Sequence, residues 1–329
     1  MVDIKLLLGF PASGKSTYAR EYASKGYCIL NRDTLGGNLD KCVSVAEESF
    51  QQGKRNFLFE NTYGTVESRA PVIAWAKKHD IPIECLWMTT SIGDAQINAV
   101  MRQLQRYGHL LSLEELKAMG KKDPNMFPPV VHYVYRKNFQ EPTLSEGFEK
   151  ITTIPFVRQR DPNVYCNKSI IVDYDGTLRK IKGQDPKMKK SADGKKLRQF
   201  PIDPSEIEIL PRRAATLERY IDQGYLMLGI SNQSGIGHGI VNDAQAKACF
   251  DATNKMLGIE IDYLYCPHNM GAGGIPCYCR KPNPGNGVLF IEKYKLDPSQ
   301  CIVVGDQKTD ASFAGVCGFK YMNPDQFFK

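Results

Sequence analysis

The sequence has little of what marks membrane, secreted and fibrous proteins. Its 329 residues contain no apolar run near the roughly 18 residues that a membrane helix needs. The first residues lack the charged segment, long apolar stretch and small-residue cleavage site of a secretion signal. There is no internal repeat, and 42% hydrophobic with 24% charged residues excludes disordered, collagen-like and coiled-coil chains. We therefore expect a soluble, intracellular protein of the nucleus or cytoplasm.

The ten cysteines are too sparse in a chain of this length for a small disulfide-stabilised fold. Three of them, Cys266, Cys277 and Cys279, lie near His268, and clustered cysteines in a reducing compartment favour a metal site. The other seven are scattered, mostly among apolar neighbours, which is typical of small core residues. They are Cys28, Cys42, Cys85, Cys166, Cys249, Cys301 and Cys317.

The net charge of +7, from 43 basic and 36 acidic side chains, indicates an anionic partner only where the charge is concentrated. One such stretch runs from Arg179 to Arg198 and holds nine Lys or Arg and two Asp. Two interpretations of it remain open: a flap that contacts phosphate groups, and a mobile, solvated insertion.

Short apolar runs alternate with helix-length segments in two successive series, which predicts two α/β domains with parallel sheets. The first series of expected strands is Ile4 to Gly9, Tyr27 to Leu30, Asn56 to Phe59 and Ile81 to Met88. The second is Ser169 to Tyr174, Leu226 to Ile230, Asp262 to Tyr265 and Cys301 to Gly305. The turn Asp161-Pro162-Asn163 separates the series, so we place the domains at residues 1–162 and 163–329.

A full Walker A pattern, Gly9 to Thr17, follows the first strand and precedes an amphipathic segment. Its glycines let backbone N–H groups surround a polyphosphate, and the N-terminus of the next helix favours the anion. Lys15 is expected to neutralise the β- and γ-phosphate oxygens of ATP, and Ser16 to ligate Mg²⁺. The residues assigned to ATP in this loop are Gly9, Ser13, Gly14, Lys15, Ser16 and Thr17.

Charged residues farther along the first domain complete a candidate kinase site. Asp33 follows the second strand, where ligands of parallel sheets bind, and is the candidate general base for an acceptor hydroxyl. The alternative is that Asp33 only caps the following helix. Arg102 and Arg106, four residues apart on an expected helix, share one face and are assigned to ATP as a lid. Without the other motifs, two arginines at this spacing would indicate only a solvent-exposed face of a helix.

Several separated motifs of the first domain resemble the kinase domain of the polynucleotide 5′-kinase/3′-phosphatase family, over roughly residues 3 to 157. They are Gly26-Tyr27, Asn31 to Gly36, Gly53-Lys54-Arg55, Tyr135 to Phe139 and Glu141 to Phe148. The resemblance implies transfer of the ATP γ-phosphate to a 5′-hydroxyl of DNA or RNA, with Asp33 as base and Arg102 in the lid. The chain departs from the family at Glu60-Asn61-Thr62-Tyr63, where a shorter carboxylate and no aromatic are expected. Tyr63 is a candidate to stack on a base.

In the second domain, Asp173 and Asp175 follow a strand and point the same way, as residues i and i+2 do in an extended chain. Such a pair suits a nucleophile and a general acid with Mg²⁺. The alternative is a turn or helix cap. Other strand ends add Ser231 and Asn232 for phosphate oxygens. Asp306 and Asp310 suit Mg²⁺, and Lys281 supplies positive charge during transfer.

These four pieces, in this order, resemble the haloacid dehalogenase phosphatase superfamily, with its Rossmann-like parallel sheet, over about residues 168 to 323. The resemblance implies that Asp173 forms an aspartyl-phosphate and that Asp175 is the general acid and base. It also implies that Ser231 and Lys281 bind phosphate. The expected Mg²⁺ ligands are Asp173, Asp175, Asp306 and Asp310.

Cys266, His268, Cys277 and Cys279 supply three thiolates and one imidazole around a loop rich in Gly and Pro, which fits a closed, structural Zn²⁺ site. The arrangement is similar to the zinc loop of histidinol-phosphate and heptose-bisphosphate phosphatases, whose substrates are small molecules. Because Lys281 lies two residues after Cys279, we expect the metal to fix the loop near the phosphate site.

Two hypotheses for the function follow. The first is a bifunctional enzyme that phosphorylates 5′-OH ends with ATP and removes 3′-phosphates with Mg²⁺, as needed in DNA repair or RNA repair. The second is a sugar or nucleoside kinase fused to a histidinol-phosphate or heptose-bisphosphate type of phosphatase. Two activities on one hydroxyl would waste ATP, whereas opposite ends of a strand avoid that cycle, so we favour the first. A non-catalytic nucleic-acid adaptor is a weaker third hypothesis, because both catalytic sets are intact.

Overall fold

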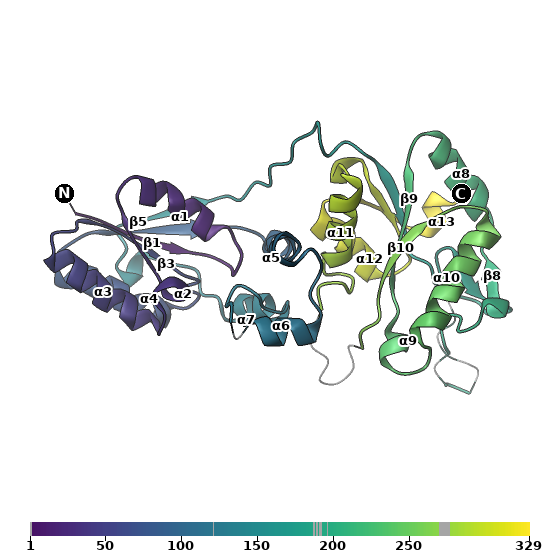
Figure 1. Ribbon diagram of the computed structural model, residues 1–329, viewed down its shortest axis with the longest axis horizontal. Helices are drawn as coiled ribbons and strands as arrows, with labels where there is room; N and C mark the ends of the chain where they lie inside the picture. Colours follow the sequence, from purple (N-terminus) through teal and green to yellow (C-terminus); the bar gives the residue numbers. More distant parts are fainter. Residues whose placement is uncertain are drawn as a thin grey trace. The chain divides into compact units, whose positions relative to one another are not determined.

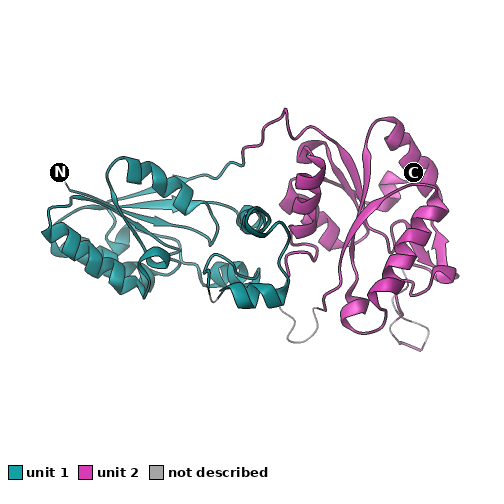
Figure 2. Ribbon diagram, viewed as in Figure 1, with its two compact units in different colours: residues 1–158 teal, residues 159–329 magenta. Residues whose placement is uncertain are grey.

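A computed structural model describes residues 2–120, 122–186, 188, 190, 193–195, 197–269 and 277–329. The chain forms two compact units, Met1–Arg158 and Gln159–Lys329 (Figure 2). Each unit is built around a five-stranded sheet (Figure 1). Within the described residues, no helix combines the length and apolarity needed to cross a membrane.

The first unit contains a parallel sheet with the strand order β2-β3-β1-β4-β5. Its central strand β1 pairs with β3 on one side and β4 on the other, so the loop after β1 lies in the middle of the carboxyl edge. The strands are β1 Asp3–Leu8, β2 Cys28–Asn31, β3 Asn56–Glu60, β4 Ile83–Met88 and β5 Lys150–Ile154.

Helices cover both faces of this sheet. Helices α3 and α4 pack against the face that carries Leu6 and Phe59, whereas Ala19 of α1 packs with Leu7 and Leu86 on the other. The helices are α1 Lys15–Ser24, α2 Arg32–Leu35, α3 Leu39–Gln51, α4 Val66–Lys78, α5 Ile92–Tyr107, α6 Leu113–Gly120 and α7 Val130–Asn138, with a 3₁₀ turn, η1, at Leu144–Glu146.

The second unit contains a parallel sheet with the order β10-β9-β6-β11-β12. Strand β6 is its centre and is buried throughout, which explains its continuous apolar sequence. The strands are β6 Ser169–Val172, β9 Leu226–Asn232, β10 Asp262–Cys266, β11 Ile302–Val304 and β12 Lys320–Met322. The expected fold class, two α/β units with parallel sheets, is confirmed.

The second sheet also lies between two helix layers. Helices α8 and α10 share a core with Ile170 and Val172 on one face, and α11 and α12 share a core with Ile171 on the other (Figure 1). The helices are α8 Arg213–Asp222, α9 Ser234–Gly237, α10 Asp243–Leu257, α11 Gly285–Tyr294, α12 Lys308–Cys317 and α13 Pro324–Phe327, with 3₁₀ turns η2 at Pro204–Glu206 and η3 at Pro298–Gln300.

The basic stretch of the second unit belongs to an antiparallel pair of short strands, β7 Arg179–Ile181 and β8 Ile207–Ile209. This pair follows the Asp173–Asp175 loop directly. Lys187, Lys189 and Lys196 of the stretch lie outside the described residues.

In both units, the candidate catalytic residues follow the carboxyl ends of parallel strands, where ligands of such sheets bind.

Candidate active sites

The Walker A loop adopts the backbone conformation that a phosphate cradle needs. Gly14 has a φ of 97° and precedes α1, and no side chain caps the first N–H groups of that helix. A Cβ at Gly9 would come within 2.9 Å of Ser13 Oγ and 3.1 Å of the Met88 carbonyl oxygen. The residues present therefore fit the polyphosphate of ATP, since glycine opens the loop and the helix N-terminus faces it.

Lys15 is folded into this loop. Its ammonium group donates hydrogen bonds to the carbonyl oxygens of Phe10 (2.7 Å) and Gly9 (3.1 Å). Burial lowers the pKa of Lys15 to about 8, although the nearby Glu60 carboxylate favours the charged form. The lysine thus lies where a phosphate would replace these carbonyl partners.

Three side chains that the sequence analysis did not single out hold the loop from outside. Thr90 donates to the Ser13 carbonyl oxygen (2.8 Å), and Asn98 donates to that of Ala12 (2.8 Å). His132 Nε2 lies 3.1 Å from the Pro11 carbonyl oxygen, and burial lowers the pKa of His132 to about 4, so the ring is neutral near pH 7. The neutral ring donates to the loop through Nε2–H, because a carbonyl oxygen only accepts.

Glu60, at the end of β3, is part of the same cavity, which has a volume of about 500 Å³. It is 3% exposed and accepts a hydrogen bond of 2.7 Å from Ser16 Oγ. A hydroxyl beside a carboxylate is a donor set suited to Mg²⁺ or to its water ligands. Glu60 therefore belongs to the candidate kinase site, although its sequence position suggested only a departure from the family.

Asp33 lines this cavity and forms an ion pair of 3.1 Å with Arg32. The alternative role of Asp33 as a helix cap is wrong, because Asn31 caps α2: its side chain accepts from the Asp33 and Thr34 N–H groups. The Asp33 carboxylate therefore does not cap the helix and lies at the cavity, paired with Arg32.

The two candidate lid arginines differ in position. Arg102 lines the cavity and donates to the Asn125 side-chain oxygen (2.9 Å). Arg106 pairs with Asp123 and is not among the described residues that line the cavity. The structure therefore brings Arg102, but not Arg106, to the Walker A loop.

The expectation that Tyr63 stacks on a base is wrong, because the ring is not accessible. Its ring is 1% exposed and belongs to the core beneath the sheet. The backbone at Tyr63 has a φ of 42°, which turns the chain as β3 ends and directs the ring inward.

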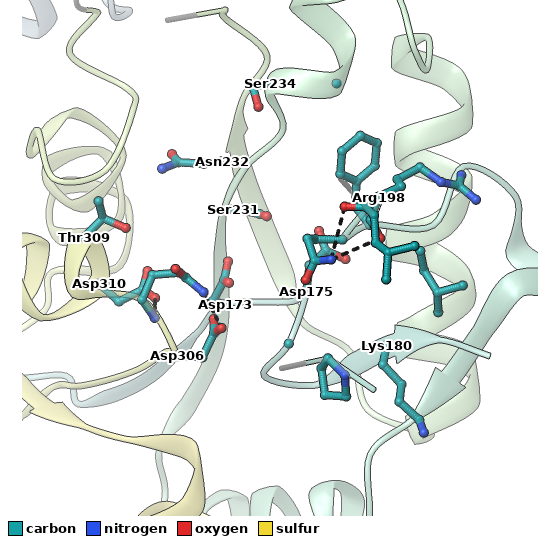
Figure 3. Close-up of a pocket in the computed structure, with 18 of the residues that line it drawn as sticks. Asp173, Asp175, Lys180, Arg198, Ser231, Asn232, Ser234, Asp306, Thr309 and Asp310 are labelled. Carbon is teal, nitrogen blue, oxygen red and sulfur yellow. Dashed lines mark hydrogen bonds between the residues drawn. The ribbon is translucent and has the colours of Figure 1, made fainter. Parts of the chain in front are cut away.

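The second site is centred on Asp173, which follows β6. Figure 3 shows its carboxylate between Asp175 on one side and the pair Asp306 and Asp310 on the other. Lys281 Nζ lies 2.9 Å from Asp173 Oδ1 and 2.7 Å from Asp310 Oδ1. Burial raises the pKa of Asp173, and Lys281 opposes that rise. Burial also disfavours charged Lys281, but Asp173 and Asp310 raise its pKa above the usual value.

Carboxylate oxygens of Asp173, Asp306 and Asp310 lie within 4.8 Å of one another. Such a set of hard oxygen donors fits Mg²⁺. The Asp175 side chain is not part of this group among the described residues, and instead pairs with Arg179 and Gln233. A Cβ at Gly305 would come within 2.3 Å of the Asp310 carboxylate, so this position of Asp310 requires glycine there.

Ser231 and Asn232 have different surroundings. Ser231 lines the cavity, is 2% exposed and accepts a hydrogen bond from Gln233. Asn232 is bonded on both sides to the backbone of Lys281: its Oδ1 accepts from the Lys281 N–H (3.0 Å), and its Nδ2 donates to the Lys281 carbonyl oxygen (3.1 Å). Asn232 therefore also holds the segment that carries Lys281.

The Cys and His residues of the second unit converge as expected. One donor atom each of Cys266, His268, Cys277 and Cys279 lies within 4.8 Å of the others. Sulfur atoms of Cys277 and Cys279 are 3.3 Å apart, and Cys279 Sγ is 3.3 Å from His268 Nδ1. This set of three sulfurs and one nitrogen fits a metal ion with four ligands.

The cavity above Asp173 has a volume of about 670 Å³ and mixed walls (Figure 3). Lys180 and Arg198 of the β7–β8 segment line it. Its apolar wall consists of Ile181, Pro186, Leu197, Phe200 and Ile240. The segment that carries the basic stretch is therefore one wall of the second site.

Comparison with known proteins agrees with this geometry. A family described as HAD-hydrolase-like matches residues 278–322. A probable D-glycero-D-manno-heptose-1,7-bisphosphate 7-phosphatase of Thermoplasma volcanium is 35% identical over 152 residues, 45% of this chain and 91% of that protein. The chain belongs to the HAD-like phosphatases. A crystal structure of D,D-heptose 1,7-bisphosphate phosphatase from B. bronchiseptica, with magnesium and phosphate, is 25% identical over 47% of this chain and 78% of that chain, with a TM-score of 0.38.

A second family model matches part of the first unit. A family described as an AAA domain matches residues 4–122. A bifunctional polynucleotide phosphatase/kinase of Schizosaccharomyces pombe is 31% identical over 160 residues, 48% of this chain and 35% of that protein. The chain is thus homologous to bifunctional polynucleotide phosphatase/kinases, and it spans about a third of that relative's length.

Proposed function

We propose that the chain heals nucleic-acid ends: it phosphorylates a 5′-hydroxyl with ATP at the first site and hydrolyses a 3′-phosphate at the second. The observation that carries this proposal is that one chain places Lys15, Asp33 and Arg102 around one cavity and Asp173, Lys281 and Asp310 around another. Homology to a bifunctional polynucleotide phosphatase/kinase supports the polynucleotide substrate.

At the kinase site, the Walker A loop and Lys15 bind the triphosphate, and Arg102 lies at the same cavity to offset the charge that spreads over the transferred group. Asp33 accepts the proton of the acceptor hydroxyl as that oxygen attacks the γ-phosphorus, while the bond from the γ-phosphorus to the β–γ bridging oxygen breaks and ADP leaves. Bound Mg²⁺, held by Ser16 and Glu60 directly or through water, would withdraw charge from the phosphate oxygens. The Walker A loop is held in place for the triphosphate by His132, Thr90 and Asn98.

At the phosphatase site, Asp173 attacks the phosphorus, and Asp175 gives its proton to the leaving oxygen. Asp175 then takes a proton from the water that releases phosphate from Asp173. Ser231 and Lys281 hold the phosphate oxygens. Bound Mg²⁺, held by Asp173, Asp306 and Asp310, would neutralise charge between nucleophile and phosphate.

The walls of the second cavity favour a nucleotide over a sugar bisphosphate. Phe200 and Ile240 present apolar surface, against which a nucleobase stacks or packs better than a polyol. Lys180 and Arg198 also line this cavity, paired with Glu208 at 3.1 Å and Glu206 at 2.7 Å, and a flanking phosphate of a strand would compete with these carboxylates for them. The Cys/His group acts as a structural Zn²⁺ site that shapes the loop before Lys281.

A small-molecule phosphatase is the second candidate, because a heptose-bisphosphate phosphatase is 35% identical over 91% of its length. The experiment is a side-by-side assay of oligonucleotides with 5′-OH and 3′-phosphate ends, histidinol phosphate and a heptose bisphosphate. We expect turnover of both oligonucleotide ends and a much steeper loss with salt for the oligonucleotide than for a mononucleotide. Turnover of a metabolite alone would contradict the proposal.

A further inference from the structure

Arg179 is a fully buried cation beside the candidate phosphatase site. It is the first residue of β7 and is 1% exposed. Its Nε donates to Asp175 Oδ1 at 2.8 Å, and its Nη1 donates to Thr253 Oγ1 at 2.9 Å and to the Cys249 carbonyl oxygen. The guanidinium therefore connects the catalytic loop to helix α10.

The Arg179 guanidinium also packs over two aromatic rings. The guanidinium carbon lies 5.3 Å from the ring centre of Tyr174 and 4.9 Å from that of Phe250. Burying a guanidinium is costly unless it is paired and hydrogen-bonded, so this arrangement depends on the Asp175 carboxylate as the counter-charge. The carboxylate is in turn bonded to a group that is held by α10 and by two aromatic rings.

The two oxygens of Asp175 have different partners. Oδ1 accepts from Arg179, whereas Oδ2 accepts from Gln233 Nε2 at 2.7 Å. A guanidinium keeps its proton at any physiological pH, so Oδ1 always faces a charged donor. Oδ2 faces a neutral amide, which also donates to Ser231 Oγ at 3.0 Å, next to the expected phosphate position.

We propose that Arg179 is a positioning residue for Asp175, and that it reserves Oδ2 for proton transfer by occupying Oδ1. This inference rests on the proposed phosphatase function. In the first step the Asp173–phosphorus bond forms, the bond to the leaving oxygen breaks, and the proton on Asp175 Oδ2 moves to that oxygen. In the second step water gives its proton back to Oδ2 as its oxygen displaces Asp173 from phosphorus.

The test compares two substrates whose leaving groups differ in their need for a proton. An alkoxide such as the 3′-oxygen of a nucleotide needs a proton to leave, whereas 4-nitrophenolate leaves without one. We therefore compare first-turnover rates of Arg179→Met, Arg179→Lys and the unchanged chain on an oligonucleotide 3′-phosphate and on 4-nitrophenyl phosphate. Arg219→Lys is the matched control, because Arg219 lies on α8, bonds Thr216 and is not among the residues that line the cavity.

We expect Arg179→Met to slow the oligonucleotide reaction at least tenfold and the 4-nitrophenyl reaction less than about threefold, since general acids contribute about 10²–10⁴. Arg179→Lys should recover part of the difference. An equal loss on both substrates, or no loss on either, would overturn the inference. If Arg179→Met does not fold, the ratio of the two rates in Arg179→Lys decides by the same criterion.

Failure of the proposed function would give results that differ from failure of the inference about Arg179. An unchanged chain that hydrolyses neither ester is not a phosphatase. An unchanged chain that hydrolyses 4-nitrophenyl phosphate and a heptose bisphosphate, but not the oligonucleotide, disproves the polynucleotide substrate. In that case the sugar phosphate replaces the oligonucleotide as the alkyl ester, and the same ratio tests the role of Arg179.

Discussion

The ammonium group of Lys281 lies 2.9 Å from a carboxylate oxygen of Asp173, 108 residues earlier in the chain. Two features bring Lys281 to this place. Asn232, at the end of β9, bonds the Lys281 backbone on both sides. The Cys/His group ends at Cys279, two residues before Lys281. The Cys/His group and the phosphate site are therefore connected through the short segment from Cys279 to Lys281.

Loss of a metal ion from the Cys/His group should lower the phosphatase activity and leave the kinase activity. Cys277→Ser is expected to reduce 3′-phosphate hydrolysis at least tenfold, because the loop no longer fixes Lys281. Metal content by mass spectrometry should fall in parallel. Cys166→Ser is the control, since Cys166 is exposed and stands outside the group. Full phosphatase activity in metal-free Cys277→Ser would contradict the structural role of the group.

The two activities should separate by single substitutions. Lys15→Met and Asp33→Asn are expected to lower 5′-phosphorylation by at least about 100-fold, because each removes a group that meets the transferred phosphate or its acceptor. Asp173→Asn should abolish 3′-dephosphorylation alone. Gel assays on end-labelled oligonucleotides measure both. Loss of both activities from any one of these changes would argue for a single shared site.

ATP binding should take up a proton at mildly alkaline pH. The pKa of Lys15 is lowered to about 8 by burial, so about half of the free protein lacks this proton at pH 8. Phosphate oxygens favour the charged form, and the proton returns on binding. Calorimetry in buffers of different ionisation enthalpy should show an uptake of about half a proton at pH 8, and almost none from this group at pH 6.5. In Lys15→Met, the proton uptake that accompanies ATP binding should be the same at the two pH values.

A buried ion pair should stabilise the first unit. Arg69 and Glu146 are joined by two hydrogen bonds of 2.7 and 2.9 Å, with side chains 0% and 5% exposed. Arg69→Met leaves the Glu146 charge buried without its partner and should lower the free energy of unfolding by about 3–5 kcal/mol. Urea denaturation measures this loss. The surface pair of Lys247 and Asp243 is the control, and Lys247→Met should cost less than about 1 kcal/mol.

Much of the fold could be predicted from the sequence, because the central strands of both sheets are short, apolar and buried. The strands that escaped prediction lie at edges or outside the main sheets. Strand β5 carries one half-exposed and one exposed threonine, and β12 is an edge strand of three residues. Strands β7 and β8 lie within and after the basic stretch, where charge masks the alternation typical of strands.

The placement of candidate site residues was predictable where they follow the ends of parallel strands, as for Lys15, Asp33 and Asp173. They were not predictable where a role depends on contacts between distant segments. His132 supports the Walker A loop from 121 residues away. Arg179 seemed one basic residue among nine in a charged stretch, yet it is buried against Asp175.

The most direct test uses one oligonucleotide that carries both a 5′-hydroxyl and a 3′-phosphate, incubated with ATP and Mg²⁺ and followed by mass spectrometry of its two ends. We predict a product with a 5′-phosphate and a 3′-hydroxyl, with the 5′ change lost in Lys15→Met and the 3′ change lost in Asp173→Asn. An oligonucleotide unchanged at both ends, under conditions in which the same protein dephosphorylates a heptose bisphosphate, would contradict the account.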